Sequence, residues 1–273
     1  MATDNNVRIA KNTLYLFFRQ ILIMIVTLYS SRVVLNALGV EDFGLYTAVG
    51  GFVAMFGIIS NSLTVAISRF LTYEMGAGRN ENLNKIFSSA ILIQLILALL
   101  LVLIAETAGV WFLNTQMTIP SSRVYASNWV FQFSVFAFMV NLIIIPYNAS
   151  IVAHEKMAAF AYIGIVQAFG ILVISLLISF SSFDRLIFYA LLMALLPIFI
   201  WSIYKWYCKK NFNECNFIFI WDLILIKQIF SFAGWNFIGA SSSILRDQGT
   251  NVLLNIFLWT YSECCSRCFY ASQ

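Results

Sequence analysis

The sequence predicts an all-α, polytopic membrane protein, and two observations predict this class. First, 61% of its 273 residues are apolar and only 10% are charged, with a mean hydropathy of +0.86. Soluble domains carry about 45–50% apolar and about 25% charged residues. Second, the apolar residues form continuous runs of at least about 20 residues, which is the length that a helix needs to cross a bilayer. Disorder is excluded because it requires low hydrophobicity, and the net charge of +4 is too small and scattered to favour nucleic-acid binding.

Six apolar runs are long enough to be transmembrane helices. We place them at about residues 12–38, 44–71, 86–108, 125–150, 158–181 and 186–206. They are continuously apolar, whereas the strands of a membrane barrel alternate apolar and polar residues, so we expect helices. The first run is too long for a signal peptide and lacks a cleavage site, so we expect it to remain in the mature protein.

The chain divides into three parts on this interpretation. Residues 1–210 are predicted to form an N-terminal lobe of six helices. Residues 211–257 begin a second lobe with a partial seventh helix, which starts near Leu223 with the amphipathic run WDLILIKQIFSF. Residues 258–273 form an aberrant tail, because the helical apolar pattern ends at Leu258.

The distribution of basic residues predicts the orientation in the membrane. The N-terminus and the connections after the second, fourth and sixth spans hold Arg8, Lys11, Arg19, Arg69, Arg79, Lys85, Lys156, Lys205, Lys209, Lys210 and Lys227. The opposite side holds Arg32, Arg123 and Arg185. Because cytoplasmic loops carry the excess of Lys and Arg, we expect both ends of the six-helix unit in the cytoplasm.

Residue types that support catalysis or metal binding are sparse. His154 is the one histidine and lies in the short connection AHEKM, where we interpret it as a solvated loop residue. Cys208 and Cys215 lie on the predicted cytoplasmic side and match no zinc spacing, so we expect reduced thiols. We therefore predict no catalytic residue, no metal site and no cofactor, and we predict that the chain is not an enzyme.

Ionisable residues inside the predicted spans are the main candidates for a functional role, because such groups are costly in hydrocarbon. They are Arg19, Arg32, Arg69, Glu106, Arg246 and Asp247. Arginines within about two turns of an interface can instead extend to the headgroups, and Arg246 with Asp247 can form a structural ion pair. The middles of the six spans contain no Asp or Glu, whereas the guanidinium fork suits phosphate, so an anionic substrate is favoured over a cationic drug.

Four segments resemble the bacterial polysaccharide-repeat flippases of the multidrug/oligosaccharidyl-lipid/polysaccharide exporter superfamily. They are SRVVLNALGVEDFGLYTAVGGF (31–52), AISRFLTYEMGAGRNENLNKIFSSA (66–90), PYNASIVAHEKMAAFAYIGI (146–165) and GWNFIGASSSILRDQGTNVLLNIF (234–257). The resemblance implies two six-helix lobes around a cavity that opens alternately to each face. It also implies export of undecaprenyl-pyrophosphate-linked oligosaccharide repeats for O-antigen or capsule, a part of lipopolysaccharide and capsule biosynthesis.

The resemblance carries over particular residues as well. Cavity arginines of such relatives are thought to hold the anionic pyrophosphate headgroup, which implies substrate binding by Arg32, Arg69, Arg246 and, less directly, Arg19. Asp247 is the candidate for ion coupling. The mid-span carboxylates of sodium-coupled relatives are missing, which puts ion coupling through the first lobe in doubt. The implied partners are the lipid-linked oligosaccharide, membrane lipid and a second lobe, which self-association would also supply.

The tail departs from the resemblance. Relatives continue after NxxLNxFFG into a second lobe, whereas this sequence reads NIFLWTYSECCSRCFYASQ. Trp259 has only the codon TGG and Thr260 begins with A, so reading one nucleotide downstream forces a glycine there. A consistent shifted translation is FGPIVNAARGVSMQV, which resembles the family segment FGPxxNAARG. We therefore expect a small insertion or deletion near the codon for Leu258, which makes the chain a fragment, and the nucleotide sequence of the locus tests this.

Three alternatives remain open from the sequence. The first is a cation-coupled drug or toxin extruder of the same superfamily, which transport of cationic dyes would support. The second is a membrane polymerase or ligase of sugar repeats, against which the short outer connections argue. The third is a membrane scaffold, which would fit if all the arginines lie at the lipid interface.

Overall fold

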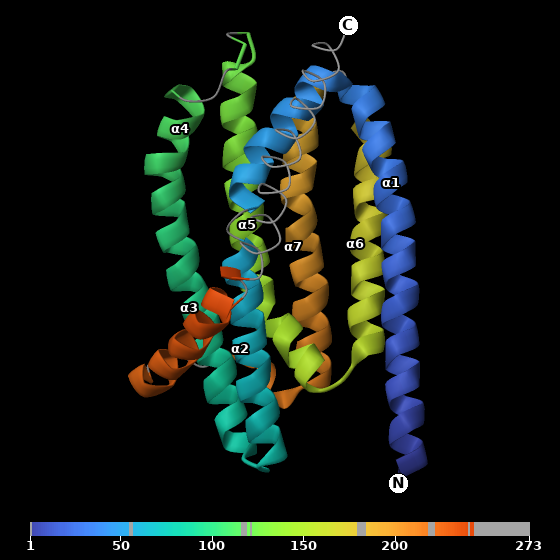
Figure 1. The fold of residues 1–273 in the computed structure, drawn as a ribbon, viewed down its shortest axis with the longest axis vertical. Helices are drawn as coiled ribbons and strands as arrows, with labels where there is room; N and C mark the ends of the chain where they lie inside the picture. The colour runs from blue at the N-terminus through green and yellow to red at the C-terminus, as the bar shows by residue number, and fades with distance from the viewer. Residues whose placement is uncertain are drawn as a thin grey trace, which may run out of the picture.

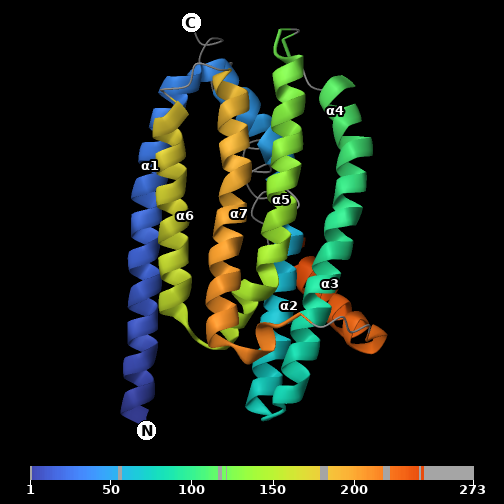
Figure 2. The same cartoon turned by 180° about the vertical axis from the view of Figure 1, so that it is seen from behind.

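A computed structural model describes residues 2–54, 57–115, 119–120, 122–178, 184–217, 222–239 and 241–242. Every regular element in these described ranges is helical, and none of them is a strand. The long helices stand side by side in one bundle (Figures 1 and 2). The predicted class, an all-α polytopic membrane protein, is confirmed. We refer below to the end of the bundle where the chain begins as the N-terminal end.

The first two predicted spans meet at a bend inside one continuous element, α1 (Ala2–Ala54). Gly39 has φ 81° and ψ 170° there, a left-handed conformation that glycine adopts at little cost. Figure 1 shows α1 rising from the N-terminus, turning over and descending towards α2 (Gly57–Gly76). The sequence LGVEDFG therefore ends the first span and starts the second, as predicted.

The remaining spans are α3 (Asn80–Ile104) extended by η1 (Ala105–Gly109) and α4 (Val110–Thr115), then α5 (Val124–Ala153), α6 (Met157–Ile178) and α7 (Arg185–Asn211). Within the described residues, five stretches are long and apolar enough to cross a membrane: Ala10–Gly51, Asn82–Leu113, Val124–Ala153, Met157–Ile178 and Arg185–Asn211. The first of these contains the bend at Gly39, so its two arms run in opposite directions.

The seventh helix begins as predicted and runs from Leu223 to Gly239. Asp222 caps its first turn, because its carboxylate accepts hydrogen bonds from the backbone N–H groups of Ile224 and Leu225 at 3.0 and 3.1 Å. Arg246, Asp247 and the tail 258–273 lie outside the described residues.

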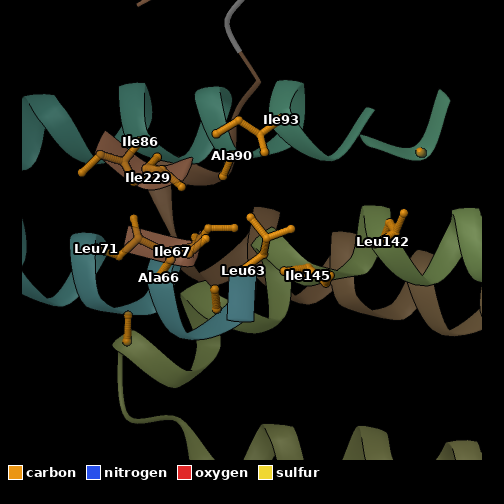
Figure 3. Packing of buried hydrophobic residues seen from close by; sticks show 14 of the residues in the cluster. Leu63, Ala66, Ile67, Leu71, Ile86, Ala90, Ile93, Leu142, Ile145 and Ile229 are labelled. Carbon is orange, nitrogen blue, oxygen red and sulfur yellow. The ribbon is translucent and has the colours of Figure 1, made fainter. Parts of the chain in front are cut away.

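Buried aliphatic side chains hold the seventh helix on the bundle. Ile229 is 0% exposed and packs in one cluster with residues of α2, α3 and α5 (Figure 3). Elsewhere α1 packs along α6 and α5 packs along α7, as both views of the ribbon show. Many large apolar side chains face outwards, including Phe17, Phe18, Leu28, Leu99, Leu103 and Phe199. Such an extensive exposed apolar surface marks contact with a membrane.

Candidate functional site

Arg19 is the one predicted site residue that the described structure places between two helices of the lobe. Its guanidinium lies 4.3 Å from the ring centre of Phe160 on α6, a cation–π distance. The Arg19 side chain crosses α6 at Gly164, where an added Cβ would lie 2.4 Å from the Arg19 Nε. That Nε is buried and forms no hydrogen bond within the described residues. Gly164 therefore leaves space for the Arg19 side chain, and the Phe160 ring packs against the Arg19 guanidinium.

Arg69 and Arg32 occupy different surroundings. Arg69, near the end of α2, places its guanidinium 4.1 Å from the ring centre of Phe232 on the seventh helix. Arg32 is exposed on α1. It lies between three and four helical turns beyond Arg19, which is about 20 Å along the axis. The described structure thus distributes these three arginines over the lobe and does not gather them into one cluster.

Glu106, the acidic candidate at the end of the third span, lies in the π-helical turn η1 and is exposed. Its carboxylate accepts a hydrogen bond of 3.0 Å from the side-chain amide of Gln132 on α5. This contact joins the third and fourth spans and leaves the carboxylate on the surface.

The lobe contains an open pocket of about 240 Å³ between the descending arm of α1 and helices α5, α6 and α7. Its polar lining comes from Tyr46, Ser134, Asn141 and Gln167, and no charged side chain lines it. A pocket without cationic side chains offers no charged partner to a pyrophosphate. The described pocket therefore suits water or small neutral groups better than the anionic headgroup.

At the end of the bundle opposite the N-terminus, Arg123 joins two carboxylates that the sequence analysis did not single out. Its Nη2 lies 2.8 Å from the Asp42 carboxylate and its Nη1 lies 2.8 Å from that of Asp184. Asp184 also caps α7 through the backbone N–H of Leu186 at 3.1 Å. Arg185 donates to the carbonyl of Ala37 at 3.0 Å. These contacts tie the bend in α1 to the first turns of α5 and α7.

At the N-terminal end, His154 is not a solvated loop residue, and that prediction was wrong. Its ring stacks on Phe212 with the centroids 4.1 Å apart and the planes at 8°, and its Nε2 pairs with the Glu214 carboxylate. His154 and Glu214 line a pocket of about 550 Å³ together with Asn84 and Lys156. The short segment after α7 folds back over the connection between α5 and α6, which brings these residues together. Because His154 and Glu214 are far apart in the chain, the sequence did not indicate that they meet.

Cys208 lies near the end of α7, and Cys215 lies within this segment. Both are free and buried, and the Cys208 thiol approaches the carbonyl of Tyr147 at 3.6 Å. Among the described residues, no group of three or more His, Cys, Asp or Glu side chains could hold a metal ion.

The fold and these sites define a helical, multi-pass membrane protein with ionic contacts at both ends of its bundle. Residues 9–262 match the family described as polysaccharide biosynthesis protein, so the chain belongs to this family. The match covers all of the described helices apart from the first residues of α1. The comparisons with curated proteins and with solved structures gave no significant match.

Proposed function

We propose that this chain takes part in flipping undecaprenyl-pyrophosphate-linked oligosaccharide repeats from the cytoplasmic to the periplasmic leaflet of a bacterial inner membrane, for O-antigen or capsule. Membership of the polysaccharide biosynthesis family carries the proposal. The sign of the charges supports it, because the first six spans contain arginines and lack central carboxylates. Guanidinium groups are well suited to phosphate oxygens.

In this proposal Arg19, Arg32, Arg69 and Arg246 guide the pyrophosphate. Because Arg19, Arg32 and Arg69 are spread along the lobe, these three act on the headgroup in succession. Arg19 has a buried Nε without a hydrogen-bond partner in the described residues, so it retains a donor for an anionic oxygen. The exposed Arg32 is placed to act nearer the opposite end of the bundle.

Alternating access requires a second surface that moves against this lobe. We propose that a second lobe supplies it, either from another copy of the chain or from a separately encoded partner. The chain is then a transporter component and carries out no covalent chemistry. The N-terminus lies in the cytoplasm.

A transport assay in proteoliposomes tests the proposal. The probe is a fluorescent undecaprenyl-pyrophosphate oligosaccharide, and flipping is measured by its loss of accessibility to a membrane-impermeant quencher. The full chain is reconstituted alone and with its partner lobe, if one is encoded beside it. We expect Arg19→Gln and Arg32→Gln each to reduce the initial rate at least tenfold, whereas Lys209→Gln, at an exposed position in the last turn of α7, leaves it unchanged.

Two results would contradict the proposal. One is a flipping rate equal to that of empty vesicles under both reconstitution conditions. The other is transport of cationic dyes that is lost on Asp247→Asn and unaffected by the arginine variants, which would identify a cation-coupled extruder instead.

A further inference from the structure

An open groove lies between the end of α2 and the seventh helix. Its volume is about 760 Å³, and it is lined by Phe70 of α2 and by side chains of the seventh helix between residues 223 and 235. Figure 1 shows this helix slanting across α3 and α2 in the half of the bundle nearer to the N-terminal end. The groove therefore opens on the flank of the bundle, beside exposed apolar side chains such as Phe230 and Ile238.

Two basic residues give the groove a positive charge. Lys227 lines it and is exposed. Arg69 is exposed as well and places its guanidinium 4.1 Å from the ring centre of Phe232, which also lines the groove. Within the described ranges, neither Lys227 nor Arg69 forms a salt bridge with a carboxylate. The described part of the lobe thus leaves this positive charge without a counter-ion.

The acidic side chains of the same two helices are engaged elsewhere. Asp222 caps the seventh helix by accepting hydrogen bonds from two backbone N–H groups of its first turn. Glu74, near the end of α2, binds Arg79 at 3.1 Å and accepts a hydrogen bond of 3.1 Å from the side-chain amide of Asn82. Charge complementarity therefore favours an anion that comes from outside the described lobe.

Polar and apolar side chains of the groove follow one another along one face of the seventh helix. Residues 224, 228 and 231 are four and three positions apart, which places them on the same face. Ile224 is 73% exposed, and Leu223 beside it is 63% exposed. Gln228 and Ser231, next to Lys227 in the lining, supply uncharged hydrogen-bonding groups. An amphiphile with an anionic head and an apolar chain matches this order, whereas a soluble anion would leave Leu223 and Ile224 without a partner.

The position of the groove favours a membrane phospholipid as this amphiphile. Basic residues are concentrated at this end of the bundle, which predicts that it lies at the cytoplasmic leaflet. Anionic headgroups of that leaflet attract basic side chains, and basic pockets between transmembrane helices bind such headgroups. A lone lysine at an interface would only extend towards the headgroups. Here a second cation and two uncharged polar groups accompany the lysine, which makes a defined site.

We propose that the groove between α2 and the seventh helix binds one anionic phospholipid of the surrounding leaflet. Lys227 contacts its phosphate, and Gln228 and Ser231 form hydrogen bonds with the headgroup. One acyl chain lies on Leu223 and Ile224. Because the lipid also touches α2, it fastens the seventh helix to the six-helix lobe. This lipid is a resident component of the membrane and not the transported substrate, so the inference goes beyond the proposed function.

Native mass spectrometry of the full chain measures lipid binding. The protein is released from detergent micelles that contain palmitoyl-oleoyl phosphatidylglycerol or, for comparison, phosphatidylcholine with the same acyl chains. We expect the first phosphatidylglycerol to bind at least threefold more tightly than phosphatidylcholine. Lys227→Gln should weaken the binding of phosphatidylglycerol about fivefold, the effect of one basic residue near an anionic surface, and leave that of phosphatidylcholine unchanged.

Two further variants and a competitor complete this experiment. Lys209→Gln is the matched control, because it removes the same charge from an exposed position in the last turn of α7, and it should leave both affinities unchanged. Ser231→Leu fills the groove at an exposed position without changing the charge, and it should weaken phosphatidylglycerol binding as strongly as Lys227→Gln. Inorganic phosphate in millimolar excess should not displace the lipid, because it cannot occupy the apolar part of the groove.

Hydrogen exchange of the wild-type chain in nanodiscs shows whether the lipid fastens the seventh helix, and it does not depend on the folding of any variant. The amides of residues 224–238 should take up deuterium more slowly in phosphatidylglycerol than in phosphatidylcholine. Those of α6, on the other side of the bundle in Figures 1 and 2, should be unaffected.

Equal wild-type affinities for the two lipids, or equal deuterium uptake in them, would overturn the proposal. Equal losses for Lys227→Gln and Lys209→Gln would also overturn it and indicate general electrostatic attraction. Displacement by inorganic phosphate would identify a site for a soluble anion. A loss in Lys227→Gln that is confined to added undecaprenyl pyrophosphate would place the groove on the path of the substrate instead. None of these measurements depends on transport, so failure of this proposal is distinguishable from failure of the proposed function.

Discussion

Arg123 and Asp42 are 81 residues apart in the chain, yet their side chains meet with the Nη2 and Oδ2 atoms 2.8 Å apart. Asp42 is 7% exposed and lies just after the bend in α1, whereas Arg123 precedes α5. The pair therefore fixes the bend against the start of another span. Asp184 binds the second nitrogen of the same guanidinium, which brings the start of α7 into the contact.

We predict that Arg123→Gln destabilises the lobe by about 1–3 kcal/mol, because it leaves the buried Asp42 carboxylate without its charged partner. The apparent unfolding temperature in detergent measures the effect. Arg185→Gln is the matched control, since it removes a single hydrogen bond to a backbone carbonyl, and we expect a smaller loss. Adding Asp42→Asn to Arg123→Gln should restore part of the stability. If the double variant is no more stable than Arg123→Gln, the carboxylate is not the source of the loss.

The contact between Arg69 and Phe232 gives a second prediction. The guanidinium lies 4.1 Å from the ring centre, and Phe232 belongs to the helix Leu223–Gly239. We expect Phe232→Leu to weaken docking of this helix by about 0.5–1 kcal/mol, the usual range for an exposed cation–π contact. Faster deuterium uptake by the amides of residues 224–238 would show the change. Trp235→Leu, at a position that is 73% exposed, is the control and should leave the uptake unchanged.

A third prediction concerns orientation. The excess of basic residues at the N-terminal end of the bundle predicts that this end faces the cytoplasm. A reporter that fluoresces only in the cytoplasm should therefore be active when fused after Lys210. A phosphatase that is active only in the periplasm should be active when fused after Ser122, which lies at the opposite end, beside Arg123. Exchanged activities at the two sites would reverse the orientation.

Local features of the sequence predicted the fold well, because each depends on nearby residues. Continuous apolar runs predicted the spans, and the break between the first two runs, at residues 39–43, contains the observed bend at Gly39. The ionic contacts were not predictable in the same way. Asp42 meets Arg123 and His154 meets Glu214 only because the bundle brings distant segments to the same end. Neither spacing nor residue type distinguishes such a histidine from a solvated one.

The candidate site was likewise predictable only in part: the sequence identified its charged residues but not their contacts. Hydropathy identified Arg19, Arg32 and Arg69 as charges within the spans, since that depends on composition alone. Their surroundings differ because Arg19 packs against α6, Arg69 packs against the seventh helix and Arg32 is exposed. Helix pairing decides these contacts, and periodicity along one helix does not reveal its neighbours.

Our last prediction tests how Gly164 accommodates Arg19. A Cβ at Gly164 would lie 2.4 Å from the Arg19 Nε, so Gly164→Leu should displace the guanidinium and reduce the apparent unfolding temperature of the wild-type chain. In an Arg19→Ala background the same substitution should cost less, because the colliding side chain has been removed. The difference between the two effects is a coupling energy, for which contacting residues give about 0.5–3 kcal/mol. Gly170→Leu is the control: its Cβ would meet Leu196 at 2.5 Å, so its effect should be independent of Arg19. Equal losses for Gly164→Leu in the two backgrounds would show that Arg19 does not pack across α6 at this glycine.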